Sequence, residues 1–254
     1  MFLFEPDRTQ FDLSWRMFGI PVRIHPMFWL LCLVLGQNLL RDSFAAFFLF
    51  VGCVLVSLLV HEMGHVLMGL YFGRSSYIVL YGFGGVAVSN RELPSRGQRI
   101  AVSLAGPAAG LVLFGLVWLF QKEALPALDP NGEKPLLWDV VYWLYLINLV
   151  WNLLNLVPIW PLDGGKISRE ILTGLLPRNG LQVSLGISFL LASLLAIQAL
   201  SAYYGGPYIP FLYTLRGPIN ALLFGVLAFQ SFQLLQQAQR PPWREDWPGR
   251  WDRR

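Results

Sequence analysis

Residues 58–70 read LLVHEMGHVLMGL, so two histidines and a glutamate interrupt an apolar run that extends from about Phe44 to about Phe72. This run is long enough to cross the hydrocarbon core of a membrane, which takes about 20 residues of helix. An ionisable side chain at that depth costs at least about 2.5 kcal/mol and persists mainly where it has a function. The stretch therefore predicts a membrane helix that carries a functional site.

The composition favours lipid as the surrounding solvent. The 254 residues are 55% hydrophobic and 13% charged, whereas a soluble domain has about 25% charged residues. The mean hydropathy is +0.51. No soluble basic domain is expected, so the net charge of +4 does not indicate a nucleic-acid partner. Cys32 and Cys53 lie inside apolar runs and are expected to be small buried side chains.

Six segments have the length and hydropathy of membrane helices, and they are 25–40, 44–72, 99–120, 138–157, 181–203 and 211–235. The expected fold class is an all-α polytopic membrane protein, with residues 1–254 forming one integral-membrane domain. With six spans, most of the 19 Lys and Arg residues lie in segments on the same side of the membrane as the N-terminus. The positive-inside rule therefore places both termini in the cytoplasm. The cytoplasmic tail 236–254 interleaves Trp with Arg and either lies on the membrane surface or is disordered.

The segment SSYIVLYGFGGVAVSN (75–90) does not have helical periodicity. Its β-branched and aromatic residues flank Gly82-Phe83-Gly84-Gly85, a pattern typical of two strands joined by a glycine turn. We expect a membrane-associated β-hairpin between the second and third spans, lying against protein or lining a cavity because lipid-exposed strand edges are unfavourable. An amphipathic interfacial loop is the alternative.

His61 and His65 are four residues apart, so a helix places them on one face, about one turn from each other. This spacing allows two imidazoles to bind one zinc ion, with Glu62 beside it as a general base. The alternative is a hydrogen-bonded polar cluster that only packs helices together. A catalytic zinc site usually has a third protein ligand, and the remaining histidine, His25, is expected to cap or anchor the first span.

Asp163 is the candidate for the third ligand among the fifteen Asp and Glu residues. Pro158 and Pro161 interrupt the helix before it, and Gly164-Gly165 after it permits a tight turn. The interrupted end can therefore direct the carboxylate sideways to a metal. The alternative is that Asp163 caps the N-terminus of the following helix.

Three amides precede this break on one face of the fourth span. Asn148, Asn152 and Asn155 are spaced i, i+4 and i+7, which is helical periodicity. Hydrogen bonding between membrane helices would account for one or two of them.

The motif HEMGH in a membrane helix, followed by Asn155-Leu-Val-Pro158 and then Leu162-Asp163-Gly164, resembles the site-2 protease family of intramembrane zinc metalloproteases. The resemblance covers about residues 44–170, the expected catalytic core. It implies that His61, His65 and Asp163 bind one Zn²⁺ per chain and that Glu62 is the catalytic base. It also implies a role for Asn155 near the substrate or its oxyanion.

The function implied by the resemblance is hydrolysis of peptide bonds in or near transmembrane segments of membrane-protein substrates. The lipid bilayer of a prokaryotic cell is the expected location. We expect the substrate to contact the hairpin at Gly84 and Gly85, and to lie near Asn152. The alternative is a non-catalytic relative that binds membrane-protein segments or handles metal, although the presence of Glu62 argues against it.

Two features depart from the pattern of many family members. Glycine stands at position 110, three residues after Pro107, where many members carry asparagine. The loop 120–138 and the C-terminal tail are too short for the PDZ or CBS domains that many relatives carry, so a compact member is expected.

Overall fold

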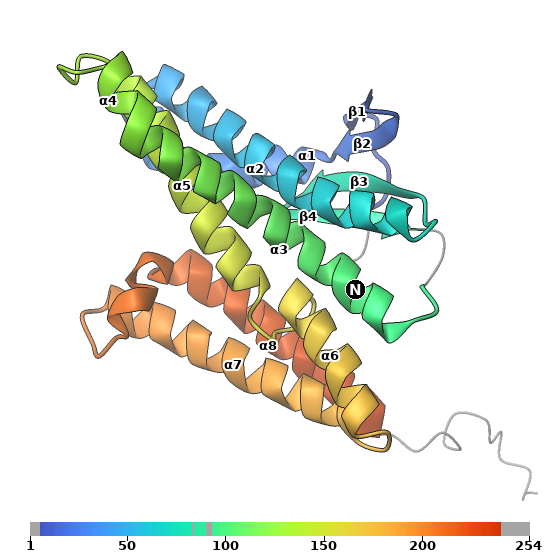
Figure 1. Cartoon of the computed structure of the whole chain (residues 1–254). Helices are drawn as coiled ribbons and strands as arrows, with labels where there is room; N and C mark the ends of the chain where they lie inside the picture. The colour runs from blue at the N-terminus through green and yellow to red at the C-terminus, as the bar shows by residue number, and fades with distance from the viewer. Residues whose placement is uncertain (1–5, 83, 90–92, 240–254) are drawn as a thin grey trace, which may run out of the picture. The chain divides into compact units, whose positions relative to one another are not determined.

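The computed structural model describes residues 6–82, 84–89 and 93–239 (Figure 1). The chain divides into two compact units, Met1–Val157 and Pro158–Arg254, called unit 1 and unit 2 below. The expectation that the whole chain forms one domain stays a prediction.

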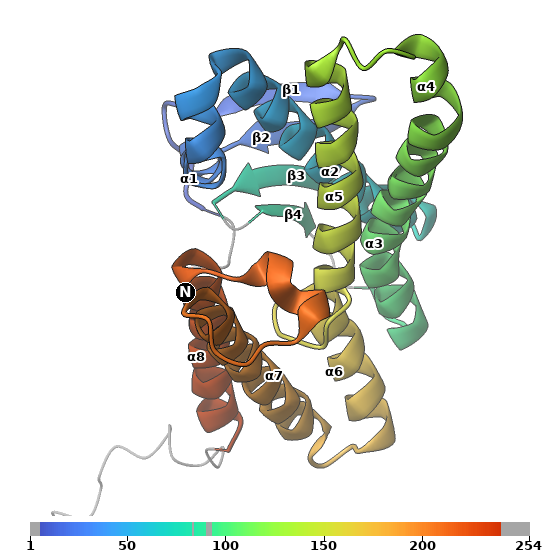
Figure 2. The ribbon, with the colours of Figure 1, turned by 90° about the vertical axis from the view of Figure 1, so that its left-hand side faces the viewer.

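Unit 1 contains a four-stranded sheet in the order β1-β2-β3-β4 (Figure 2). Strand β1 (Leu13–Met17) is antiparallel to β2 (Ile20–Ile24). Strand β2 runs parallel to β3 (Ser76–Tyr81), and β3 is antiparallel to β4 (Gly84–Ser89). The part of the chain that the structure describes therefore has two more strands than the sequence predicted, although helices dominate it as expected.

The predicted pairing of the two strands after the second span is confirmed. Strands β3 and β4 pair from Ser76 opposite Ser89 to Tyr81 opposite Gly84. Phe83 in the turn lies outside the described residues, as do residues 240–254 of the predicted tail. The association of this hairpin with the membrane stays a prediction.

The unpredicted strands β1 and β2 form a hairpin of their own. Its two-residue loop, Phe18-Gly19, has positive φ at both positions, 51° and 81°, which is the conformation that joins twisted antiparallel strands most tightly. On β2, Val22 and Ile24 are buried, and β2 pairs with β3 from the distant hairpin. Strands of five residues are stabilised mainly by contacts with the neighbouring strand. The short sequences of β1 and β2 alone therefore did not predict them.

The α-helices in the described residues of unit 1 are α1 (Pro26–Asp42), α2 (Phe44–Tyr71), α3 (Arg96–Leu119), α4 (Leu125–Leu128) and α5 (Pro135–Asn155). A π-helical turn, Phe120–Ala124, joins α3 to α4. The predicted cap at the start of α1 is confirmed, because His25 Nδ1 accepts a hydrogen bond from the Met27 N–H at 3.2 Å.

Helix α2 is central to unit 1 and packs against α1, α3, α5, β3 and β4. Its buried side chains include Leu58 and Val66, which share one apolar core with Phe28 of α1 and with Ile78 and Leu80 of β3. The helix that carries the HEMGH motif therefore lies against the sheet and three other helices of unit 1.

Five helical segments in the described residues are long and apolar enough to cross a membrane, and they are Phe44–Tyr71, Arg96–Leu128, Pro135–Asn155, Gly180–Tyr203 and Pro218–Gln239. The predicted polytopic membrane fold is confirmed. The sixth expected span forms α1, a helix of 17 residues, at the lower limit of a spanning length. The count of six therefore stays a prediction.

Unit 2 contains α6 (Asp163–Leu175), α7 (Gly180–Tyr203) and α8 (Pro218–Gln239), with a short 3₁₀ helix, Pro210–Leu215, before α8. Helix α7 packs against both α6 and α8. Gly180 permits the sharp return from α6, since a Cβ there would overlap the Leu172 carbonyl group.

Candidate metal centre

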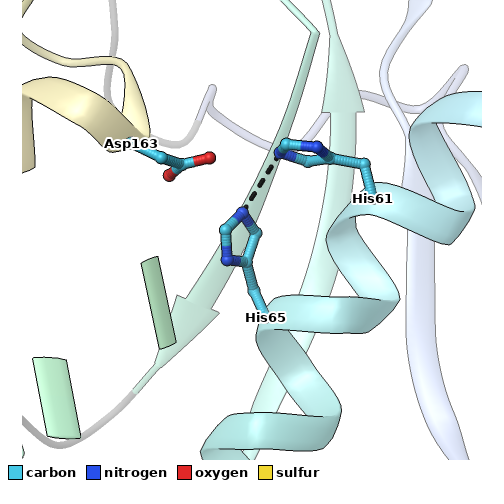
Figure 3. A group of neighbouring side chains, drawn as sticks. All are labelled: His61, His65 and Asp163. Carbon is cyan, nitrogen blue, oxygen red and sulfur yellow. Dashed lines mark hydrogen bonds between the residues drawn. The ribbon is translucent and has the colours of Figure 1, made fainter. Parts of the chain in front are cut away.

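All three ionisable residues of the HEMGH motif are buried on α2. The exposed fractions of His61, Glu62 and His65 are 2%, 4% and 6%. The two imidazole rings are close, with His61 Nε2 and His65 Nε2 3.2 Å apart (Figure 3). The predicted shared helix face is therefore confirmed.

The tautomer of His61 follows from its partner on α5. Asn152 Nδ2 donates to the Asn148 carbonyl oxygen at 2.6 Å, and a carbonyl oxygen can only accept. The amide oxygen of Asn152 must then face His61 Nδ1, 2.8 Å away. Because this oxygen is an acceptor, Nδ1 carries the proton, and in the neutral ring Nε2 has a lone pair.

The tautomer of His65 is set by α3. His65 Nδ1 lies 2.7 Å from the carbonyl oxygen of Val102. This oxygen also accepts only, so Nδ1 is the protonated nitrogen and Nε2 of the neutral ring again has the lone pair.

These assignments place the Nε2 atoms of two neutral rings, each with a lone pair, 3.2 Å apart in a buried place. A hydrogen bond across the gap, which is dashed in Figure 3, needs one ring to be an imidazolium. A bound cation satisfies both lone pairs with both rings neutral. Two nitrogen ligands of one tetrahedral zinc, each about 2.0–2.1 Å from it, are about 3.3–3.4 Å apart, close to the observed 3.2 Å. The histidine pair therefore fits a zinc ion.

Three glycines leave the space that the side chains of Glu62, His65 and Asn152 occupy. A Cβ at Gly85 of β4 would lie 2.6 Å from Glu62 Oε1, and a Cβ at Gly106 of α3 would overlap the ring of His65. A Cβ at Gly110, also on α3, would overlap the amide of Asn152. Side chains at these positions would therefore displace the polar groups of the site.

Helix α5 presents its three asparagines to the interior of unit 1, as their spacing predicted. Asn148, Asn152 and Asn155 are 0%, 1% and 8% exposed. Asn148 Nδ2 donates to Ser57 Oγ on α2 at 2.9 Å, so the predicted hydrogen bonding between helices is found for this residue. Asn155 Nδ2 donates to the Trp151 carbonyl oxygen at 2.9 Å.

Trp151 is a residue of this region that sequence reasoning did not find. Its indole ring lies against Gly84, where a Cβ would be 2.7 Å from Cζ2, and Gly84 has a φ of 118°. Both features require glycine at position 84. A tryptophan within an apolar helix has no pattern that distinguishes it from a lipid-facing aromatic residue, so the sequence offered no signal for this contact.

Asp163, labelled in Figure 3, belongs to unit 2 and is the first residue of α6. It is 3% exposed, and its Oδ1 accepts a hydrogen bond from Lys166 Nζ at 3.0 Å. Leu162 takes the cap position of α6, so the alternative role of Asp163 as the N-cap is not found. Gly165 allows the preceding loop to fold back, since its Cβ would lie 2.5 Å from the Ile159 carbonyl group.

Comparisons with known proteins agree with this chemistry. The model of Peptidase family M50 matches residues 132–196. Zinc metalloprotease MJ0392 of Methanocaldococcus jannaschii is 31% identical over 185 residues, which are 71% of this chain and 52% of that protein. Putative zinc metalloprotease sll0528 of Synechocystis is 34% identical over 61% of this chain and 42% of its own length. The chain thus spans about half the length of the curated relatives it matches.

A further relative and a solved structure point the same way. Stage IV sporulation protein FB of Bacillus subtilis is 28% identical over 65% of this chain. The structure of a site-2 protease from Methanocaldococcus jannaschii matches with a TM-score of 0.57 and 22% identity, over 88% of this chain and 94% of that one. At this identity the structural match shows the fold. The sequence matches and the HEMGH geometry make the chain similar to members of Peptidase family M50.

Proposed function

We propose that this protein is an intramembrane zinc metalloprotease that hydrolyses peptide bonds in or near transmembrane segments of other membrane proteins. The observation that carries the proposal is the buried pair His61 and His65, whose Nε2 atoms lie 3.2 Å apart, with Glu62 on the same helix. The relatives named as zinc metalloproteases support it. The proposed location is a prokaryotic cell membrane with both termini in the cytoplasm.

The proposed ligands of one Zn²⁺ per chain are His61, His65 and Asp163. All three are buried and each offers one ligand atom. Two imidazoles and one carboxylate form a donor set of catalytic zinc sites, which keep a further position for water or substrate. When bound, the ion supplies a Lewis acid that polarises the scissile carbonyl and lowers the pKa of water to about 7.

Glu62 is the proposed general base. It takes the proton from the attacking water and passes it to the leaving amine when the peptide bond breaks. Its position supports this role, because it is the next residue to His61 on α2 and its carboxylate is confined by the backbone of β4 at Gly85. A confined carboxylate is already oriented, so little conformational entropy is lost when it reaches the transition state.

Asn155 is the proposed donor to the oxyanion that forms on the substrate carbonyl. Its amide nitrogen has two hydrogens, and one donates to the Trp151 carbonyl oxygen. That bond fixes the direction of the amide and leaves the second hydrogen for the substrate. A fixed donor is the kind that stabilises developing negative charge.

Strand β4 is the proposed platform for the substrate. A peptide bond must be extended to be cut, and β4 is at one end of the strand order, with β3 as its partner. An extended segment can add to such an edge by main-chain hydrogen bonds. Gly84 and Gly85 would then bring the substrate close to Glu62, which lies against Gly85.

The proposal is tested by measuring zinc content and cleavage together in detergent. We expect wild type and Glu62→Gln to hold about one zinc per chain, and Asp163→Ala to lose it. Only wild type should cleave a panel of single-span membrane proteins in liposomes. Full zinc content in Asp163→Ala would remove this residue from the ligand set. A zinc-loaded wild type that cleaves no more than Glu62→Gln would favour a non-catalytic relative.

A further inference from the structure

We propose that Asn152 is a positioning residue that holds His61 in the tautomer needed to bind a cation, and that Gly110 is the recess in which its amide is fixed. The proposal rests on the proposed zinc function and deepens it. It assigns Asn152 a role different from the expected contact with substrate.

The amide of Asn152 is held at both of its ends. It is 1% exposed, its Nδ2 donates to the Asn148 carbonyl oxygen at 2.6 Å, and its Oδ1 faces His61 Nδ1 at 2.8 Å. Turning the amide over would direct Nδ2 at His61 and Oδ1 at a carbonyl oxygen. That arrangement loses the bond to Asn148 and places two acceptors together, so the observed orientation is the stable one.

The tautomer of His61 matters because of the ring beside it. A neutral His61 protonated on Nε2 would donate to His65 Nε2, which is 3.2 Å away and accepts. The two rings would then satisfy each other, and a metal would have to break that hydrogen bond and move the proton. Asn152 favours the proton on His61 Nδ1 and so keeps the lone pair of that ring on Nε2.

Gly110 gives the amide its place between helices. A Cβ at this position would meet Nδ2, Oδ1 and Cγ of Asn152 as its three nearest atoms. The recess on α3 is therefore shaped around one side chain of α5. An added methyl group would push the amide out of line with His61.

A second hydrogen bond joins α2 and α5 one turn earlier on each helix. Asn148 Nδ2 donates to Ser57 Oγ, and both residues precede the Asn152 and His61 pair by four positions. Asn148 uses its side chain for this bond and its backbone oxygen to hold Asn152. Its side chain can be removed without removing the acceptor that orients Asn152, so Asn148→Ala is a matched control.

The test measures Co²⁺ affinity by chelator competition in purified protein, together with the visible spectrum of the bound ion. Asn152→Leu keeps the side-chain size but removes the acceptor, and should weaken binding about 10–100-fold, the usual effect of losing a bond to a ligating histidine. Asn152→Asp keeps an acceptor for His61 Nδ1 although it loses the bond to the Asn148 carbonyl oxygen, so it should bind Co²⁺ more tightly than Asn152→Leu does. Gly110→Ala should resemble Asn152→Leu, whereas Asn148→Ala and Gly115→Ala should bind as wild type does.

Nitrogen-15 NMR of the histidine rings in metal-free protein separates this proposal from the zinc function. Wild type should show His61 protonated on Nδ1, and Asn152→Leu should shift the proton to Nε2. The same tautomer in both proteins, or wild-type affinity in Asn152→Leu, would overturn the positioning role. The expected tautomer shift in a protein that binds neither Co²⁺ nor Zn²⁺ would support the positioning role and refute the zinc function.

Discussion

Glu62 on α2 packs so closely against Gly85 on β4 that a Cβ at position 85 would lie 2.6 Å from Glu62 Oε1. This contact joins the membrane helix to the strand hairpin at the proposed general base. The Glu62 carboxylate can occupy its position only if residue 85 is a glycine, because real Cβ atoms do not approach other atoms so closely.

Gly85→Ala is therefore expected to displace the Glu62 carboxylate and leave the histidine pair in place. We predict a loss of at least about 100-fold in cleavage rate, the typical contribution of a positioned general base, with zinc content unchanged. Gly52→Ala on α2, where an added Cβ meets no neighbouring atom within 4 Å, is the control and should retain the rate. Equal rates in the two variants would show that β4 does not position Glu62.

Gly106→Ala should act on the metal instead. A Cβ at Gly106 would overlap His65 Nε2 and the ring carbons beside it, whereas Gly115 on the same helix has open space. We predict that Gly106→Ala weakens zinc affinity about 10-fold or more and that Gly115→Ala leaves it unchanged. Chelator competition measures both, and circular dichroism confirms that each variant is folded. Unchanged zinc affinity in folded Gly106→Ala would contradict the prediction.

Proline substitutions along β4 test the proposed substrate platform. Successive residues of a strand direct their N–H groups to opposite edges, so Val86→Pro, Ala87→Pro and Val88→Pro should alternate in effect. A proline whose lost N–H faced β3 should lower stability, because it removes a ladder hydrogen bond. A proline whose lost N–H faced outwards should keep zinc and stability but lose cleavage. Cleavage at the wild-type rate in every stable variant would exclude pairing of the substrate with this edge.

The loop before α5 should give the protein an acid-sensitive element. Burial disfavours the charged form of Asp129, but hydrogen bonds from the Lys134 N–H, the Trp138 indole and the Glu133 N–H outweigh it and lower the pKa of Asp129 below its usual 3.8. A pKa lowered by folding adds stability that is fully present above pH 3.8 and is lost as the pH falls through the folded value.

Asp129→Asn should therefore lower the melting temperature near neutral pH, and its difference from wild type should shrink as the pH falls below about 4. Intrinsic tryptophan fluorescence in detergent follows the transition. Glu133→Gln is the control, because it keeps the backbone N–H that Asp129 accepts. A difference that stays constant from neutral pH to pH 3 would contradict the assigned pKa direction.

The sequence by itself determined which helix carries the chemistry. The spacing of His61 and His65 is local, so the 3.6-residue period of a helix places their side chains together whatever surrounds them. The same reasoning held for the buried face of Asn148, Asn152 and Asn155, and for the helix break at Pro158, since each depends on residues a few positions apart.

Only the tertiary structure decided what those side chains contact. His61 meets Asn152 across 91 positions of sequence, and His65 meets Val102 across 37. The pairing of β2 with β3 likewise joins separate segments of unit 1. Such contacts depend on how closely two backbones approach, which glycines at 85, 106 and 110 permit. The periodicity of one segment predicts which face is buried, but the tautomers and the confinement of Glu62 arise from packing between segments.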